Sequence, residues 1–306
     1  MDKYAALLET ITGIKDSVSG EGAFSLRLDG ASHSMQSTRN IRIEKKTDKA
    51  GIDIFVAAGT KGEEVHIPVI ISQSGLKELV YNDFYIGEDS DVRIIAGCGI
   101  NNCGCDDSGH DGVHSFHVGK NARVVYAEKH AGIGDGTGKR IMNPVTEVEL
   151  DDGAYMEMDT VQIGGVDDTK RTTRAVLGNE ATLIVTEKIM TEGDQYAETD
   201  FEIELNGENS GTHVISRSVA KGDSRQLFIS NIKGNNVCSG HTECDAIIMD
   251  NASVSAVPKI SANSPDASLI HEAAIGKIAG EQLIKLMTLG LTEKEAEEKI
   301  VAGFLK

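Results

Sequence analysis

A short internal repeat sets the strongest limit on the fold of this chain. Each unit starts with an apolar residue, continues through a turn rich in Gly, Asp and Asn, and then reaches a small residue followed by alternating apolar positions. The units lie at residues 86–94 (IGEDSDVRI), 118–126 (VGKNARVVY), 150–158 (LDDGAYMEM), 177–185 (LGNEATLIV) and 249–257 (MDNASVSAV). Their starts are 32, 32, 27 and 72 residues apart. Such spacings are typical of a β-solenoid, whose coils stack with their turns at equivalent corners. Ordinary hairpins of a β-sandwich are the alternative.

Runs of alternating apolar residues indicate a chain built mainly from strands. They fill most of the stretch from about residue 24 to residue 260, and few helical periods interrupt them. The runs lie at residues 52–56, 65–71, 92–95, 124–127, 145–150, 183–189, 201–205, 214–219 and 246–249. The chain has 33 Gly but only 4 Pro and no Trp. This pattern disfavours alternating βαβ units and favours a regular architecture with many turns.

Helices are predicted only near the two ends. Residues 1–18 form an amphipathic pattern, because apolar residues recur there at helical spacing. They are Tyr4, Leu7, Leu8, Ile11 and Ile14. We expect a helical segment over 1–23, a β-helix core over 24–266 and a helical domain over 267–306.

The tail is predicted to be a helical hairpin. Residues 271–289 carry an apolar stripe, and Gly290 can end that helix. Thr292 and Glu295 have the spacing of a capping box, so a second helix begins there. A hairpin of this kind can cap the open end of a solenoid, and it can also dock a partner.

The charge of the chain excludes some classes of partner. There are 30 Lys and Arg against 48 Asp and Glu, which gives a net charge of 30 − 48 = −18. This surplus opposes binding to nucleic acids and to anionic membranes. No uninterrupted apolar run resembles a secretory signal or a membrane span. We therefore expect a cytoplasmic protein whose five cysteines serve as thiols or ligands.

Thiols and imidazoles are densest just after residue 97. The group consists of Cys98, Cys103, Cys105, His110, His114 and His117, with Glu128 and His130 in the following run. Such side chains suit zinc, iron or an iron–sulfur cluster. The spacing matches neither a zinc-finger pair nor a ferredoxin run. A Gly-, Asn- and Asp-rich loop whose thiols are close only by chance is the alternative.

A second group lies near the C-terminus. Cys238, His241 and Cys244 are three residues apart, and His271 and Glu272 follow in the tail. In a strand, residues two apart share a face, so Cys244 would share a face with Ala246. From spacing alone, a small buried hydrophobe is the better interpretation of Cys244.

Two other functions find little support in the sequence. The Gly-rich segment 132–140 lacks both the Gly spacing and the Ser or Thr after Lys that a phosphate-binding P-loop needs. Paired carboxylates such as Asp151 and Asp152 lie at predicted turns, where Asp is favoured for backbone reasons. A carbohydrate-active β-helix enzyme using such carboxylates, and a solenoid with a structural metal, stay open as alternatives.

Several segments resemble the SufB/SufD family of iron–sulfur cluster assembly proteins. They are residues 82–89 (NDFYIGED), 96–100 (AGCGI), 240–249 (GHTECDAIIM), 271–278 (HEAAIGKI) and the helical end that starts at 290–296 (GLTEKEA) and reaches 303–304 (GF). The resemblance runs from about residue 24 onward. It implies a mainly β fold, a right-handed parallel β-helix with a short N-terminal helix and a C-terminal helical hairpin.

The resemblance also implies particular site residues. Cys244 matches the cluster-associated Cys of SufB, which reverses the interpretation from spacing and makes it a thiolate ligand or sulfur acceptor. His271 and Glu272 match positions that SufB and SufD use nearby. The loop with Cys98, Cys103 and Cys105 becomes a candidate second cluster or sulfur site.

By the same resemblance, the chain is expected to be a scaffold subunit and not an enzyme by itself. It would pair along the β-helix, as a homodimer or as a SufB/SufD-type heterodimer, and build a transient iron–sulfur cluster. A SufC-type ABC ATPase would hydrolyse ATP and bind the tail, through Ile278, Leu283, Leu286, Met287, Ile300 and Phe304. A separate protein would donate sulfur. A flavin stays open as a further cofactor.

Overall fold

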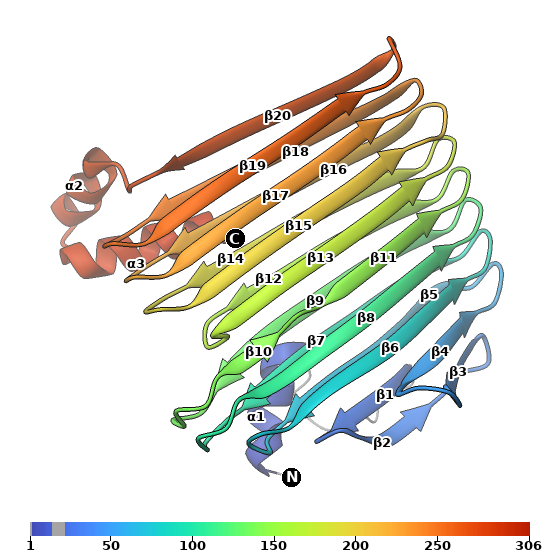
Figure 1. Ribbon diagram of the computed structural model, residues 1–306, viewed down its shortest axis with the longest axis horizontal. Coiled ribbons are helices and arrows are strands. Elements are labelled where there is room, and N and C mark those ends of the chain that lie inside the picture. The colour runs from blue at the N-terminus through green and yellow to red at the C-terminus, as the bar shows by residue number, and fades with distance from the viewer. Residues whose placement is uncertain (1, 14–21) are drawn as a thin grey trace.

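Two facing β-sheets make up most of the molecule. The structure is a computed structural model that describes residues 2–13 and 22–306. It is a parallel β-solenoid of about eight turns with 61% strand, so the expected fold class is confirmed (Figure 1). Neighbouring strands are parallel in all pairs except β1 with β2 and β3 with β4, at the N-terminal end.

The two sheets take alternate strands from the chain. Sheet A contains, in spatial order, β2 (Ala31–Gln36), β1 (Ala23–Leu28), β5 (Lys61–Ile71), β7 (Asp91–Asn101), β9 (Arg123–Ile133), β12 (Tyr155–Ile163), β14 (Thr182–Thr191), β16 (Ser210–Ala220), β18 (Cys238–Ile248) and β20 (Ala267–Gly276). Sheet B contains β3 (Ile41–Lys45), β4 (Gly51–Val56), β6 (Lys77–Ile86), β8 (Ser108–Val118), β10 (Arg140–Met142) with β11 (Val145–Leu150), β13 (Asp168–Leu177), β15 (Tyr196–Leu205), β17 (Arg225–Gly234) and β19 (Ser253–Ala262).

The repeat corresponds to the turns that lead from sheet B to sheet A. In the first four units the fourth residue has positive φ, and these residues are Asp89, Asn121, Gly153 and Glu180. The fifth unit lies at the opposite corner, between β18 and β19, where Asp250 has positive φ instead. The 72-residue gap therefore arises because two kinds of corner carry similar turns.

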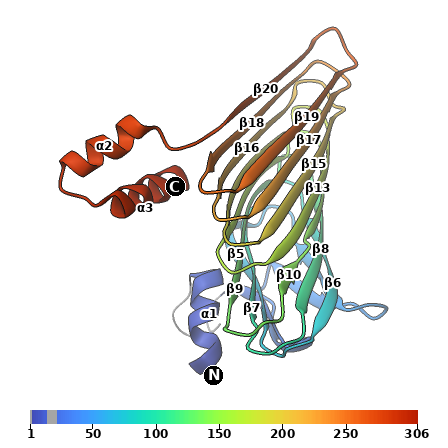
Figure 2. The same ribbon diagram turned by 60° about the vertical axis from the view of Figure 1, so that its left-hand side comes forward.

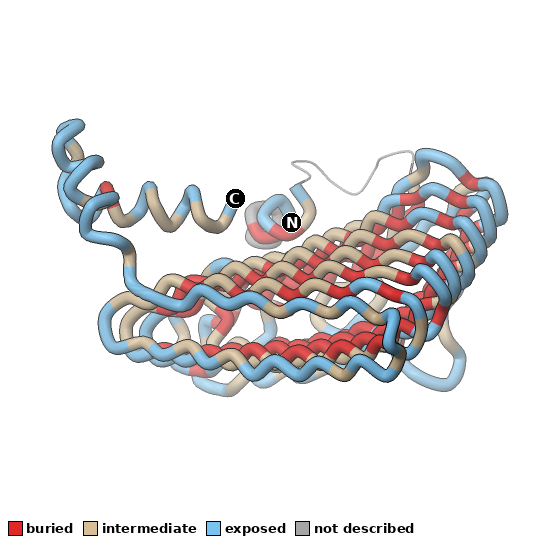
Figure 3. Tube along the Cα trace, turned by 90° about the horizontal axis from the view of Figure 1, so that it is seen from above, coloured by how far each residue is buried: buried red, intermediate tan, exposed pale blue. Residues whose placement is uncertain are grey.

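The core lies between the sheets. Side chains alternate along each strand, so that in β14 and β15 every second residue is buried. Figure 3 shows the buried residues along the facing sides of the two sheets. Within this core Phe84 and Phe116 stack with ring centroids 4.3 Å apart. Stacking of equivalent positions from coil to coil thus continues inside the solenoid.

The N-terminal helix packs on the outer face of sheet A. Helix α1 (Asp2–Thr12) places Leu7 and Ile11 against two glycines of β7. A Cβ atom on Gly99 would lie 2.5 Å from Leu7 Cγ, and one on Gly97 would lie 2.9 Å from Ile11. The predicted N-terminal helix is therefore confirmed over Asp2–Thr12. Ile14 and the side chain of Tyr4 lie outside the described residues.

The first residues of the tail differ from the prediction. The expected helix over residues 271–289 is wrong in its first part, because Ala267–Gly276 forms strand β20 in register with β18. The helices are α2 (Gly280–Thr288) and α3 (Glu293–Phe304), and the capping box of Thr292 and Glu295 is present. The free edge of β18 supplies backbone partners that outweigh the helical spacing of Ile275 and the residues after it.

The helical hairpin does not cover the open end of the solenoid. It stands beside sheet A on the same side as α1 (Figures 2 and 3). The last strands, β19 and β20, have no buried residue among them. In the described part of the chain, every helix is too short or too polar to cross a membrane.

Candidate functional site

The predicted core residues Cys244 and His271 lie on β18 and β20, the last two strands of sheet A at the open end of the solenoid. Cys244 lies on β18 with its side chain on the inner face, and only 1% of it is exposed. His271 lies on β20 and pairs with Thr242, which is also buried. Because residues two apart share a face, His271 and Cys244 occupy diagonal positions on the same inner surface. β20 pairs alongside Cys244 and is the last strand of sheet A in the described part of the chain, so no further strand covers His271.

Both groups are held in a neutral state. Burial raises the pKa of the Cys244 thiol to about 12, and the carboxylates of Glu187 and Asp245 act in the same direction. Burial and then His241 lower the pKa of His271. Among the described residues, neither ring nitrogen of His271 has a hydrogen-bond partner. The end of the solenoid therefore presents a protonated thiol beside an imidazole with a free lone pair.

Glu272 does not join these two residues. It faces the outer side of sheet A, in register with Glu243, and its Oε2 lies 3.5 Å from His241 Nε2. His241 also falls on the outer face, opposite both Cys238 and Cys244. The three-residue spacing of Cys238, His241 and Cys244 thus does not gather three ligands, because it alternates between the two faces.

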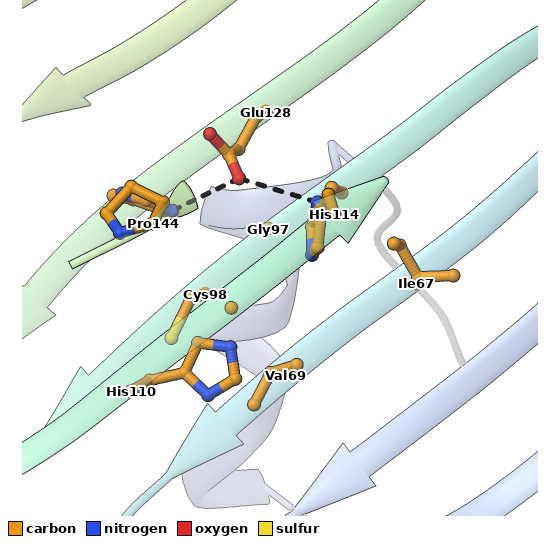
Figure 4. A pocket seen from close by; sticks show the side chains of 11 residues that line it. Ile67, Val69, Gly97, Cys98, His110, His114, Glu128 and Pro144 are labelled. Carbon is orange, nitrogen blue, oxygen red and sulfur yellow. Dashed lines mark ion pairs between the residues drawn. The ribbon is translucent and has the colours of Figure 1, made fainter. Parts of the chain in front are cut away.

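A second group lines a small pocket inside the N-terminal half of the solenoid. Figure 4 shows Cys98, His110, His114 and Glu128 around it, with Pro144 on the side across from His114. The cavity measures about 10 Å³, which is room for about one water molecule. Pro144 interrupts sheet B between β10 and β11, and so opens the ladder beside the pocket.

A chain of hydrogen bonds fixes the imidazole of His114. Tyr126 donates its hydroxyl proton to Glu128 Oε1 over 2.9 Å, so that His114 Nδ1 must donate to the Tyr126 oxygen over 2.7 Å. His114 Nε2 is then free to accept from Asn82 Nδ2 over 3.2 Å. Burial lowers the pKa of His114 to about 4, with further lowering by His110, His130 and Arg171. His114 is therefore neutral at physiological pH.

A buried arginine links this pocket to the rest of the interior. Arg171 on β13 donates to Glu128 Oε2, and its Nε lies 3.6 Å from Glu187 Oε1. Burial alone would raise the pKa of Glu128, but Arg171 and the nearby imidazoles outweigh it and hold that pKa well below its usual range. Burial raises the pKa of Glu187, which accepts from Ser216 Oγ at 2.9 Å. Polar groups thus extend from the pocket toward β16, next to Cys244.

The three thiols of the predicted loop site are not brought together. Cys98 is buried on the inner face of β7, and burial raises its pKa well above the usual value. Cys103 and Cys105 are exposed in the turn that follows. His117 faces outward from β8, where its Nδ1 lies 2.8 Å from Glu149 Oε2.

The sequence reasoning missed Arg171 and Glu187. Their signal lies in the strand periodicity, since each charged residue occupies an inward position between buried neighbours. A charge at such a position needs a partner across the interior. The partner itself could not be named, because it depends on which coils face each other.

The predicted partner-binding residues divide into two groups. Leu283, Leu286, Ile300 and Phe304 are half-buried in the hairpin, as is Ile278 just before it. Met287 is exposed. Ile284 and Leu289, which the prediction omitted, are 63% and 75% exposed. The apolar surface that the hairpin offers to solvent is therefore centred on Ile284, Met287 and Leu289.

The chain is similar to one family of known proteins. A family profile described as "SUF system FeS cluster assembly, SufBD core domain" matches residues 78–304. An "Iron-sulfur cluster assembly SufBD family protein" of Methanocaldococcus jannaschii is 27% identical over 98% of this chain and 97% of its own length. Proteins with the same description from Pyrococcus horikoshii and Archaeoglobus fulgidus are each 28% identical, over 99% and 86% of this chain and 94% and 70% of their own lengths.

Proposed function

Since the chain belongs to the SufBD family of SUF-system iron–sulfur cluster assembly proteins, we propose that it is a scaffold subunit on which a cluster is built transiently and then released. Iron and sulfide are the cargo of such a scaffold. The protein's part is to supply ligands that hold the cargo and then let it go.

One observation supports this proposal above the others. Cys244 and His271 share the inner face at the uncovered end of the solenoid. Thiolate and imidazole are ligands that suit iron. Because the Cys244 thiol has a pKa of about 12, iron must displace its proton to bind. A ligand of that kind binds iron more weakly at lower pH, which suits a site that must release its cargo.

The same open end is the surface through which we propose that the chain dimerises. The last two strands carry exposed apolar residues, including Val257 and Ile260 on β19 and Ile270 and Ile275 on β20. A second copy, or a SufD-like chain, would cover these residues and enclose Cys244 and His271. Glu272 of either copy would then lie at the rim of the interface.

We further propose that a SufC-type ABC ATPase binds the tail hairpin. The exposed Ile284, Met287 and Leu289 favour a partner with an apolar groove. ATP hydrolysis would take place on that partner, and movement of the hairpin would change access to the open end. The five free cysteines fit the reducing cytoplasm, where a sulfur donor protein would deliver sulfide.

Anaerobic reconstitution with iron and sulfide tests this function. We expect the parent protein to gain a visible chromophore and bound iron, and the Cys244→Ser variant to lose both. Cys238→Ser is the matched control, because Cys238 is also buried on the inner face of β18. A triple Ser variant of Cys98, Cys103 and Cys105 tests the alternative site.

Each outcome assigns the site. A chromophore lost only in the triple variant would move the cluster to the region of β7 and the turn that follows it. No chromophore in any protein, even with the ATPase partner present, would contradict the scaffold function.

A further inference from the structure

Three potential metal ligands gather on the outer face of sheet A. His213 on β16 pairs in register with His241 on β18, and Glu243 lies two residues further along β18. The ligand atoms of these three side chains all lie within 4.8 Å of one another. Among the residues that the structure describes, no other three His, Cys, Asp or Glu side chains bring their ligand atoms so close together. Cys244, by contrast, faces the other side of the sheet.

The contacts within this group leave ligand capacity unused. His213 Nε2 lies 2.9 Å from Glu243 Oε1, while His241 Nδ1 lies 3.7 Å from the same oxygen. The two imidazole rings are stacked, with centroids 4.8 Å apart and planes 3° from parallel. Among the described residues, His241 Nε2 is buried and has no hydrogen-bond partner, although Glu272 Oε2 lies 3.5 Å away.

The set of donors is that of a known type of iron site. Two imidazoles and one carboxylate with open coordination positions suit Fe(II) and related divalent ions. Ligand atoms on one such ion lie roughly 3 Å apart, because each is about 2.1 Å from the metal. The three side chains are half-buried on rigid neighbouring strands, so rotation of side chains alone can close the remaining distance. A shared cation would also bind the second lone pair of Glu243 Oε1, which an ion pair with His213 alone leaves unused.

We propose that His213, His241 and Glu243 form a binding site for a divalent first-row metal ion, with Glu272 at its edge. The identification of this ion as the Fe(II) supplied for cluster assembly rests on the proposed function, while the metal site itself does not. Three protein ligands leave positions for water, so the ion would stay exchangeable. Glu243 and Cys244 are consecutive residues on opposite faces of β18, and Glu272 and His271 have the same relation on β20. The shortest route from this site to the inner thiol therefore runs around the edge of β20.

Metal titration of the full-length protein without sulfide tests the site. Co(II) is the probe, followed by its visible absorption, and Fe(II) is added anaerobically in a parallel titration. We expect one ion per chain in the parent. His213→Asn, His241→Asn and Glu243→Gln should each weaken binding roughly tenfold or more.

Two controls make the result specific. The first control is His117→Asn. Within the described residues, His117 contacts Glu149 on an outer face but has no second imidazole beside it. This variant should leave metal binding unchanged, and so should Cys238→Ser, which alters a buried thiol on the inner face of β18. Metal should also raise the melting temperature of the parent, and this rise should vanish in the three site variants while their melting temperatures without metal stay near that of the parent.

The outcomes separate this site from the scaffold function. Parent-like binding in all three site variants, or binding lost in Cys238→Ser, would overturn the proposal. If Co(II) and Fe(II) bind as expected but no chromophore forms with sulfide, the site stands and the scaffold function fails. If a Cys244-dependent chromophore forms while the site variants bind metal like the parent, the scaffold function stands and this site fails.

Discussion

Arg171 and Glu128 form an ion pair that joins the two sheets through the interior of the solenoid. Arg171 belongs to β13 of sheet B and Glu128 to β9 of sheet A, and both are almost fully buried. Removal of one partner from a buried pair leaves an uncompensated charge, which costs roughly 3–5 kcal/mol. We expect Arg171→Ala to lower the free energy of unfolding by about that amount, as measured by urea denaturation.

A control for this prediction lies on the same strand. Arg174 faces outward from β13, and its Nε lies 3.7 Å from Glu202 Oε2 on an exposed surface. Arg174→Ala should change the free energy of unfolding by only about 0–1 kcal/mol. Equal effects of the two substitutions would mean that the interior pair is not desolvated as described.

The depressed pKa of His114 predicts a loss of stability in mild acid. In the folded chain this pKa is about 4, whereas an unfolded histidine has a value near 6.5. Between these values the unfolded state binds a proton and the folded state does not, so stability falls as the pH decreases from about 6.5 to 4. The shift corresponds to about 3 kcal/mol over the whole interval. Urea denaturation at a series of pH values measures it.

Two variants show whether His114 is the cause. His114→Gln should make the free energy of unfolding nearly independent of pH between pH 6.5 and 4. At neutral pH the same variant should be less stable than the parent, because it breaks the contacts to Tyr126 and Asn82. His117→Asn, on the exposed side of the same strand, should keep the slope. An unchanged slope in His114→Gln would assign the acid sensitivity to other groups.

The sequence predicted the solenoid well because its turns are local. A residue with positive φ must recur at the same corner of each coil, and Asp89, Asn121 and Gly153 occupy that corner at equal spacing. The repeat therefore shows directly in the sequence. The last coil was harder to predict, since the residues from His271 onward have helical spacing and their strand depends on backbone partners from β18.

That error had a consequence for the candidate site. On a helix, His271 and Glu272 would both lie near the start of one element, with their side chains about 100° apart around its axis. On β20 they face opposite sides of sheet A, so Glu272 lies with His241 instead of with Cys244. The site with His213 was not foreseen at all, because its ligands meet only through the register between β16 and β18.

Thiol accessibility gives a test of how the five cysteines are placed. Cys103 and Cys105 are exposed, whereas Cys98, Cys238 and Cys244 are buried. The thiolate is the reactive form, and the Cys244 thiol has a pKa of about 12. We expect iodoacetamide at neutral pH to modify two thiols quickly, and all five only after denaturation. Mass spectrometry of the digested protein identifies them. If Cys244 reacts as fast as Cys103, its thiol is not buried as described.

Substitutions on the exposed surface of the tail hairpin should weaken partner binding without destabilising the fold. Ile284 and Leu289 are 63% and 75% exposed, so replacing both with Glu removes little packing and should leave the free energy of unfolding within about 0.5 kcal/mol of the parent. The same change places charges on the apolar surface proposed to bind the ATPase and should abolish co-purification with a SufC-type partner.

A matched double variant tests whether that effect is specific to the hairpin. Ile133 and Ile163 are exposed to 41% and 43% at the ends of β9 and β12, away from the tail. Replacing both with Glu adds the same charge to the protein and should leave co-purification intact. Since added negative charge alone can weaken association with an acidic partner, a loss in both double variants would indicate general repulsion. A loss confined to Ile284 and Leu289 would assign the contact to the hairpin, and retention in that variant would contradict it.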